Sequence, residues 1–210
     1  MKAIGIILAG GNNSRMQELS NKRAIAAMPI GGSYRSIDFA LSNMSNSHVQ
    51  TVAVLTQYSA RSLNEHLSSS KWWDFGRKQG GLFVLTPTMT TENNSWYRGT
   101  ADAMYQNIDF LRESHEPYVI ITSGDCVYKT DFNKMLEYHI NKKADITVGY
   151  TKLAAGQDDP TRFGVMQMDT DGRVLSFEEK PVVTDNMTVS TGIYIIRRRL
   201  LIGLLEKANA

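Results

Sequence analysis

The sequence predicts an α/β protein with a Rossmann-like, doubly wound and mostly parallel sheet. Short, wholly apolar runs, such as IGIIL (residues 4–8) and YVII (118–121), have the length of buried strands. They alternate along the chain with segments whose apolar residues recur at helical spacing. Strands that alternate with helices predict parallel strands joined by helical crossovers. In that architecture ligands bind at the carboxyl ends of the strands, so the loops after the strands are the expected site.

The remaining elements follow in the same alternating order. Further strands are expected at 51–55, 82–85, 145–150 and 193–196, and helices at 37–45, 62–67, 100–112, 131–141 and from 200–205 onward. The stretch 87–95 is rich in Thr and Asn and is expected to be a loop. Two short apolar runs, 165–168 and 174–177, flank Asp171-Gly172 and predict a β-hairpin.

Composition narrows the class of protein. With 210 residues, of which 42% are hydrophobic, the chain is long enough for one sizeable core. A net charge of +2 gives no strong field toward nucleic acid or an anionic membrane, so neither is expected as a partner. No apolar run is long enough to be a signal peptide or to span a bilayer. The single cysteine, Cys126, fits a reducing cytoplasm and is expected to be a small buried residue.

The stretch IGIILAGGNNSR (4–15) feeds a strand into a glycine-containing loop that ends on Arg15. Backbone N–H groups of such a loop can bind a phosphate, and Gly10 and Gly11 would allow a close approach. An ordinary strand-to-helix turn is an equal alternative on this stretch alone. The glycine spacing matches neither the dinucleotide-binding fingerprint nor the P-loop, which disfavours dehydrogenases and P-loop kinases.

Two charged residues after predicted strands are candidates for chemistry. Asp125 follows a wholly apolar strand, where a carboxylate is a natural Mg²⁺ ligand, and the alternative is a cap on the following turn. Lys180 can hold a phosphate as a point charge, although on its own it is better explained as a surface lysine.

Several blocks of sequence occur in an order that carries a family resemblance across essentially the whole chain. They are LAGGNNSRM, KRAIAAMPIGGSYRSIDFALSNM, LTQYSARSLNEHL, WYRGTADAMYQNIDFL, SGDCVYKTDF, RFGVMQMDTDGRVLSFEEKP and STGIYII. Together they resemble the glucose-1-phosphate adenylyltransferase (ADP-glucose pyrophosphorylase) family of sugar-nucleotide pyrophosphorylases. The resemblance implies a nucleotidyltransferase that converts ATP and α-D-glucose 1-phosphate to ADP-glucose and pyrophosphate in glycogen biosynthesis, with Mg²⁺ as cofactor and an oligomeric assembly.

The resemblance also assigns roles to residues of this sequence. Asp125 matches the catalytic, metal-binding aspartate, and Arg15 matches the catalytic arginine of the phosphate loop. The nucleotide is expected at Leu8, Ala9, Gly10, Gly11, Gln57, Gly99 and Thr100. The sugar phosphate is expected at Tyr97, Glu179, Lys180, Ser190 and Gly192.

Three positions depart from the family pattern. Asn13 replaces the inner glycine of G-G-x-G-[ST]-R, Ile25 replaces the lysine of R-A-K-P-A, and Ser33 stands where lysine is usual. Losing one cation beside the phosphates is expected to lower the rate roughly 100- to 1,000-fold. The sequence is therefore similar to the regulatory, D-type glycogen biosynthesis subunit, which assembles with a catalytic paralogue.

Two alternatives remain open at this point: a fully active adenylyltransferase and another sugar-phosphate nucleotidyltransferase. The family's second metal-binding aspartate and its left-handed β-helix domain are expected beyond residue 210. We accordingly expect residues 1–210 to be a nucleotidyltransferase-like domain truncated at its C-terminal end.

Overall fold

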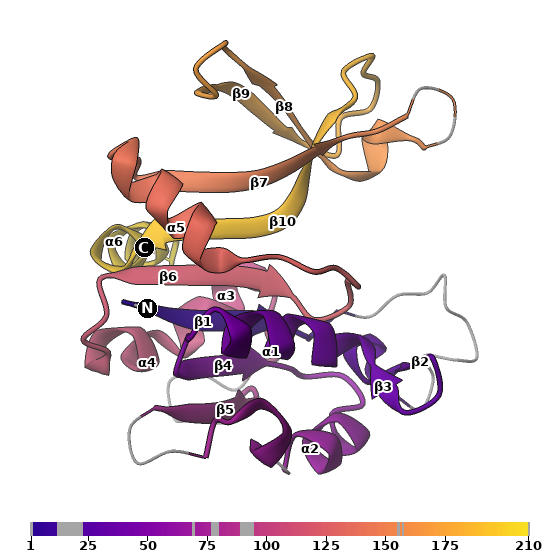
Figure 1. Ribbon diagram of the computed structural model, residues 1–210, viewed down its shortest axis with the longest axis vertical. Coiled ribbons are helices and arrows are strands. Elements are labelled where there is room, and N and C mark those ends of the chain that lie inside the picture. The colour runs from indigo at the N-terminus through magenta and orange to yellow at the C-terminus, as the bar shows by residue number, and fades with distance from the viewer. Residues whose placement is uncertain are drawn as a thin grey trace. The chain divides into compact units, whose positions relative to one another are not determined.

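The computed structural model describes residues 2–11, 23–68, 70–76, 80–88, 95–154, 156 and 158–209. The chain divides into two compact units, one formed by residues 1–146 with 195–210 and the other by 147–194. The first unit is a parallel sheet with helices, and the second is built on antiparallel strands (Figure 1). This arrangement confirms the predicted α/β fold with a mostly parallel sheet.

Strand β1 (Ala3–Leu8) lies at the centre of the first unit. It pairs in parallel with β4 on one side and β6 on the other, and β5 pairs in parallel with β4. These neighbours are β4 (Thr51–Leu55), β5 (Gly81–Leu85) and β6 (Tyr118–Ser123). The residues of β1 from Ala3 to Ile7 are all buried, which is why this strand reads as a continuous apolar run in place of an alternating one.

The helices of the first unit cover the sheet from both sides. In Figure 1, α1 lies in front of the strands, and α3 and α6 lie behind them. The helices are α1 (Ser36–Asn46), α2 (Arg61–Leu67), α3 (Thr100–Gln106), α4 (Ile108–Glu113), α5 (Phe132–Asn141) and α6 (Arg198–Asn209). Smaller elements are the 3₁₀ helices η2 (Ile25–Ala27) and η3 (Ser70–Trp73) and the paired strands β2 (Pro29–Ile30) and β3 (Tyr34–Arg35).

The single helix expected over 100–112 is wrong, because the structure has two helices that meet at Asn107. Asn107 leaves the helical conformation, with φ −113° and ψ 29°. Its side-chain amide donates to the carbonyl of Ala103 at 2.8 Å and to the hydroxyl of Tyr97 at 2.8 Å. An asparagine that bonds locally to the backbone in this way competes with the helix, and apolar spacing alone does not reveal that competition.

The second unit contains the predicted hairpin. Its elements are β7 (Ile146–Lys152), η4 (Pro160–Arg162), β8 (Gly164–Met168), β9 (Val174–Glu179) and most of β10 (Thr188–Arg197). Strands β8 and β9 are antiparallel, as are β8 and β10. The turn between β8 and β9 has Gly172 at φ 77°, a left-handed conformation that glycine adopts without strain.

Buried residues in the core of the first unit are expected to contribute most to its stability. Ile120 on β6 is 0% exposed, so Ile120→Ala removes buried methyl groups and leaves a cavity. We expect it to lower the free energy of unfolding by about 2–5 kcal/mol in urea denaturation. The matched control is Val182→Ala, because Val182 is 93% exposed and its truncation should change stability by no more than about 0.5 kcal/mol. Equal effects of the two variants would contradict the assignment of Ile120 to the core.

Candidate functional site

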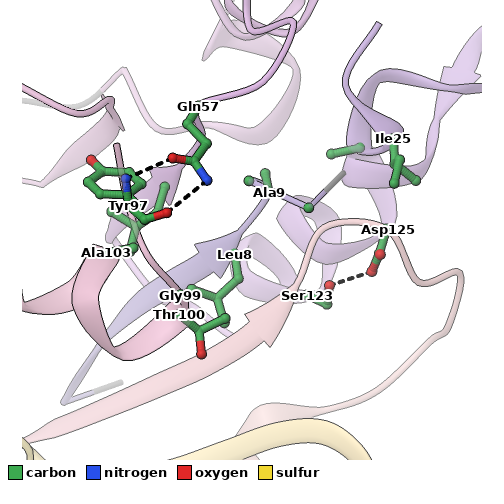
Figure 2. A pocket seen from close by; sticks show the side chains of 14 residues that line it. Leu8, Ala9, Ile25, Gln57, Tyr97, Gly99, Thr100, Ala103, Ser123 and Asp125 are labelled. Carbon is green, nitrogen blue, oxygen red and sulfur yellow. Dashed lines mark hydrogen bonds between the residues drawn. The ribbon is translucent and has the colours of Figure 1, made fainter. Parts of the chain in front are cut away.

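A pocket of about 270 Å³ opens at the carboxyl ends of the parallel strands in the first unit. Leu8, at the end of β1, lies in register with Leu55 at the end of β4 and with Ser123 at the end of β6. The pocket wall is Leu8, Ala9, Gly10, Gly11, Ile25, Ala26, Leu55, Gln57, Tyr97, Gly99, Thr100, Ala103, Ser123 and Asp125 (Figure 2). The site thus lies at the edge of the sheet where parallel α/β folds bind ligands.

All the residues that the sequence assigned to a nucleotide line this one pocket. The strand-to-loop passage is fixed by Ala9, whose N–H donates to the Leu55 carbonyl at 2.8 Å and whose carbonyl accepts from Thr56 Oγ1 at 3.3 Å. Beyond it, a Cβ added at Gly11 would have no atom of the described residues within 4 Å. The described part of the glycine loop therefore leaves room for a ligand group against its backbone.

Gln57 and Tyr97 are linked to each other in the wall of the pocket. Gln57 Nε2 donates to the carbonyl of Tyr97 at 3.3 Å, and the N–H of Tyr97 donates to Gln57 Oε1 at 2.9 Å (Figure 2). The Tyr97 side chain is buried, and burial raises the pKa of its hydroxyl, which accepts a hydrogen bond from Asn107. Tyr97, expected at the sugar phosphate, lines the same pocket as the residues expected at the nucleotide.

Asp125 stands on the loop that follows β6 and is exposed at the pocket. Its Oδ1 accepts a hydrogen bond from Ser123 Oγ and a longer one, 3.6 Å, from Cys126 Sγ. Cys126 is exposed, so its expected burial is wrong: the apolar run ends before it, and the residue lies on an open loop. Partial desolvation and the neighbouring Asp125 carboxylate raise the pKa of the Cys126 thiol to about 11, which leaves it a weak nucleophile at neutral pH.

The other residues expected at the sugar phosphate belong to the second unit. Lys180 has φ 48°, an uncommon conformation for a residue with a side chain, and its N–H donates to the Phe163 carbonyl at 3.0 Å. Its Nζ lies 3.7 Å from Oε1 of Glu179. In the same unit, Gly192 at φ 73° donates its N–H to Ser190 Oγ at 3.1 Å. The role of these residues in sugar binding stays a prediction.

Two positions named from the sequence, Asn13 and Arg15, lie outside the described residues. Ile25, by contrast, is described and forms part of the pocket wall. In Figure 2, Ile25 and Asp125 lie on one side of the pocket and Gln57 and Tyr97 on the other. The aliphatic side chain of Ile25 therefore lines the pocket at the position where the family pattern has a lysine.

Several wall residues were missed by the sequence reasoning: Ala26, Leu55, Ala103 and Ser123. Leu55 and Ser123 end parallel strands, so a rule that includes the last residue of each strand would have found them. Ala103 follows Thr100 by one helical turn, so it faces the same way on α3. Ala26 has no local signal, because it reaches the pocket from a short 3₁₀ helix.

The donor groups can be compared with the needs of Mg²⁺. Among the described residues, no group of three or more His, Cys, Asp or Glu side chains is arranged to hold a metal ion. Mg²⁺, however, is commonly held by one or two carboxylates together with substrate phosphates and water. The exposed Asp125 carboxylate fits that mode, and it is the residue that would hold the ion.

Comparisons with known proteins show the family to which the chain belongs. A family model described as "Nucleotidyl transferase" matches residues 4–209. The chain belongs to the nucleotidyl transferase family. A crystal structure of a Bacillus anthracis protein, described as a candidate glucose-1-phosphate thymidylyltransferase, has the same fold, with a TM-score of 0.76 and 23% identity over 95% of this chain and 73% of that one.

Among curated members of this nucleotidyl transferase family, the chain is similar to proteins named glucose-1-phosphate adenylyltransferase. The protein of Bacillus subtilis is 42% identical over 205 residues, which are 98% of this chain and 53% of the relative. The protein of Clostridium acetobutylicum is 45% identical over 204 residues, which are 97% of this chain and 53% of the relative. The chain thus spans about half the length of the curated relatives that it matches.

Within the described ranges, no helix has both the length and the apolar character needed to cross a bilayer.

The link between Gln57 and Tyr97 predicts a structural cost for its loss. Gln57→Leu leaves the N–H of the buried Tyr97 without its partner, so we expect the free energy of unfolding to fall by about 1–3 kcal/mol. Chemical denaturation would measure the effect. Gln167→Leu, at an exposed position on β8, is the control and should leave stability unchanged; a Gln57→Leu protein as stable as wild type would refute the link.

Proposed function

We propose that this chain is the nucleotidyltransferase part of a glucose-1-phosphate adenylyltransferase-type protein of glycogen biosynthesis, with weakened catalysis and a regulatory role. It would bind ATP and glucose 1-phosphate in the cytoplasm and assemble with a catalytically active paralogue. The family match and the named relatives support the type of transferase. The observation that carries the weakened catalysis is Ile25 in the wall of the pocket that also includes Asp125.

The proposed reaction depends on stabilising negative charge more than on covalent catalysis by the protein. An oxygen of the sugar phosphate forms a bond to the α-phosphorus of ATP, the bond to the bridging oxygen breaks, and pyrophosphate leaves. The protein aligns these groups and offsets their negative charge. Asp125 would hold Mg²⁺, which supplies part of that charge when it is bound. On the same side of the pocket, Ile25 offers only carbon atoms, which offset none of that charge.

The binding half of the function has separate support. The apolar wall formed by Leu8, Ala9 and Leu55 suits a nucleoside, and the glycine backbone suits phosphates. Neither feature depends on a charged side chain at position 25. The chain is therefore proposed to bind the substrates of the reaction while turning them over slowly. In the oligomer, binding at this site would alter the rate or the substrate affinity of the catalytic partner.

The first test measures pyrophosphate release from ATP and glucose 1-phosphate with Mg²⁺. It uses the full-length protein that contains this chain, alone and mixed with its catalytic paralogue. We expect a rate alone that is roughly 100- to 1,000-fold below that of the paralogue, because one cation beside the phosphates is lost. We also expect a changed rate or affinity in the mixture. Strong activity of the protein alone would establish the fully active alternative, and activity with another nucleotide in place of ATP would establish a different sugar-phosphate nucleotidyltransferase.

A second test restores the charge. Asn13→Gly combined with Ile25→Lys is expected to raise the rate of pyrophosphate release by about 100-fold, because it returns an ammonium group and backbone access to the phosphate loop. The matched control is Ile140→Lys, which adds the same charge at an exposed isoleucine on α5. A double variant as slow as the parent, in a protein that still binds ATP, would exclude a defect confined to this loop.

A further inference from the structure

The loop that carries Asp125 is long and has no regular secondary structure. It runs over 124–131, between the end of β6 and the start of α5. Segments of this kind sample many conformations unless their backbone groups have fixed partners. The position of the Asp125 carboxylate at the pocket therefore depends on what holds the rest of the loop.

Both ends of the loop are anchored. At its start, the N–H of Gly124 donates to the carbonyl of Leu8 at 2.9 Å, which joins the loop to the end of β1. At its end, the N–H of Phe132 donates to Oγ of the buried Ser47 at 3.0 Å. These contacts fix where the loop leaves β6 and where it enters α5, but they do not fix the path between.

The middle of the loop is held by one buried side chain, Asn43 on α1, which is only 4% exposed. Its Nδ2 donates to the carbonyl of Tyr128 at 3.0 Å, and its Oδ1 accepts from the N–H of Thr130 at 3.2 Å. Tyr128 is tied back to β6 through a hydrogen bond between its hydroxyl and that of Thr122. One amide thus satisfies a donor and an acceptor of the loop, and no hydrocarbon side chain could do the same.

The spacing on α1 explains why the helix can do this. Asn43 and Ser47 are four residues apart, so they lie on the same side at the end of α1, and both bond to the segment after β6. The two residues differ in what they hold. Ser47 bonds to the first residue of α5, whereas Asn43 bonds to the loop within a few residues of Asp125.

We propose that Asn43 is a positioning residue that fixes the loop over 128–130 and thereby holds the Asp125 carboxylate at the pocket for a divalent cation and its nucleotide. The role given to Asp125 rests on the proposed function. The attachment of the loop to α1 does not rest on it. The two parts of the inference are therefore testable by separate measurements.

The first measurement follows the position of the loop without any ligand. Hydrogen–deuterium exchange of the backbone amides over 124–130, followed by peptide mass spectrometry, reports on the loop, because the N–H of Thr130 is bonded to Asn43. Asn43→Ala is expected to speed this exchange about tenfold, because two backbone groups of the loop lose their partner. Asn43→Asp keeps an acceptor for Thr130 but not the donor to Tyr128, and should give a smaller increase.

The second measurement follows the cation. Binding of Mn²⁺ in the presence of ATP is monitored by electron paramagnetic resonance in the full-length protein. Loss of a residue that orients a metal ligand typically weakens metal binding about 10- to 100-fold, and we expect this of Asn43→Ala. Ser47→Ala is the matched control: it should lower the melting temperature, yet change amide exchange over 124–130 and Mn²⁺ binding less than about twofold, because it releases only the far end of the loop.

The outcomes separate the two claims. If Asn43→Ala leaves both amide exchange and Mn²⁺ binding unchanged, or if Ser47→Ala changes both as strongly, Asn43 is a structural residue and the inference is overturned. If wild-type protein binds no Mn²⁺ with ATP, the proposed function fails at Asp125, and amide exchange alone decides whether Asn43 fixes the loop. Should Asn43→Ala not fold, the comparison of Asn43→Asp with Ser47→Ala gives the same decision.

Discussion

The parallel pairing of β1 with β4 and β6 is the constraint on which the rest of the first unit depends. Because these strands run in the same direction and in close register, Leu8, Leu55 and Ser123 end at one edge of the sheet. This register determines where each pocket residue that follows a strand lies. The burial of β1 on both faces fixes the register, since a shift along the strand would break its packing against the helices.

Polar side chains fix the segments that the strand register does not fix. Gln57 binds both backbone groups of Tyr97, and Asn43 binds the loop that carries Asp125. In each case a residue on or beside a rigid element satisfies backbone groups of a segment without regular structure. An amide side chain whose donor and acceptor are both used is costly to replace, because any apolar substitute leaves backbone groups of the loop unsatisfied. The pocket is therefore built from rigid strand ends and from loops that are tied to them at specific atoms.

These two kinds of contact explain how far the sequence could predict the structure. The strands and the hairpin were predictable, because β1 and β6 are apolar runs and Asp171-Gly172 has turn chemistry. The break at Asn107 and the exposure of Cys126 were not, since apolar spacing ignores a side chain that bonds to the backbone and says nothing of an open loop. The link between Gln57 and Tyr97 joins residues 40 positions apart, and it has no local signal. The residues expected at the nucleotide came from the family resemblance; most of them lie at or just after strand ends, whereas Gly99 and Thr100 open α3.

The contacts that form the pocket also explain how a transferase fold could keep its pocket while its catalysis weakens. The groups that shape the pocket are mostly backbone and uncharged side chains, and Ile25 is one of the aliphatic residues among them. Under the proposed function, isoleucine in place of the family's lysine at position 25 removes a charge that the phosphates would use, and its apolar, part-buried side chain is expected to cost the fold little stability. A substitution that removes a catalytic charge is thus expected to cost little stability, whereas a substitution of Asn43 or Gln57 is expected to be destabilising. A regulatory subunit derived in this way is expected to preserve the amides that fasten the loops and to lose the cations first.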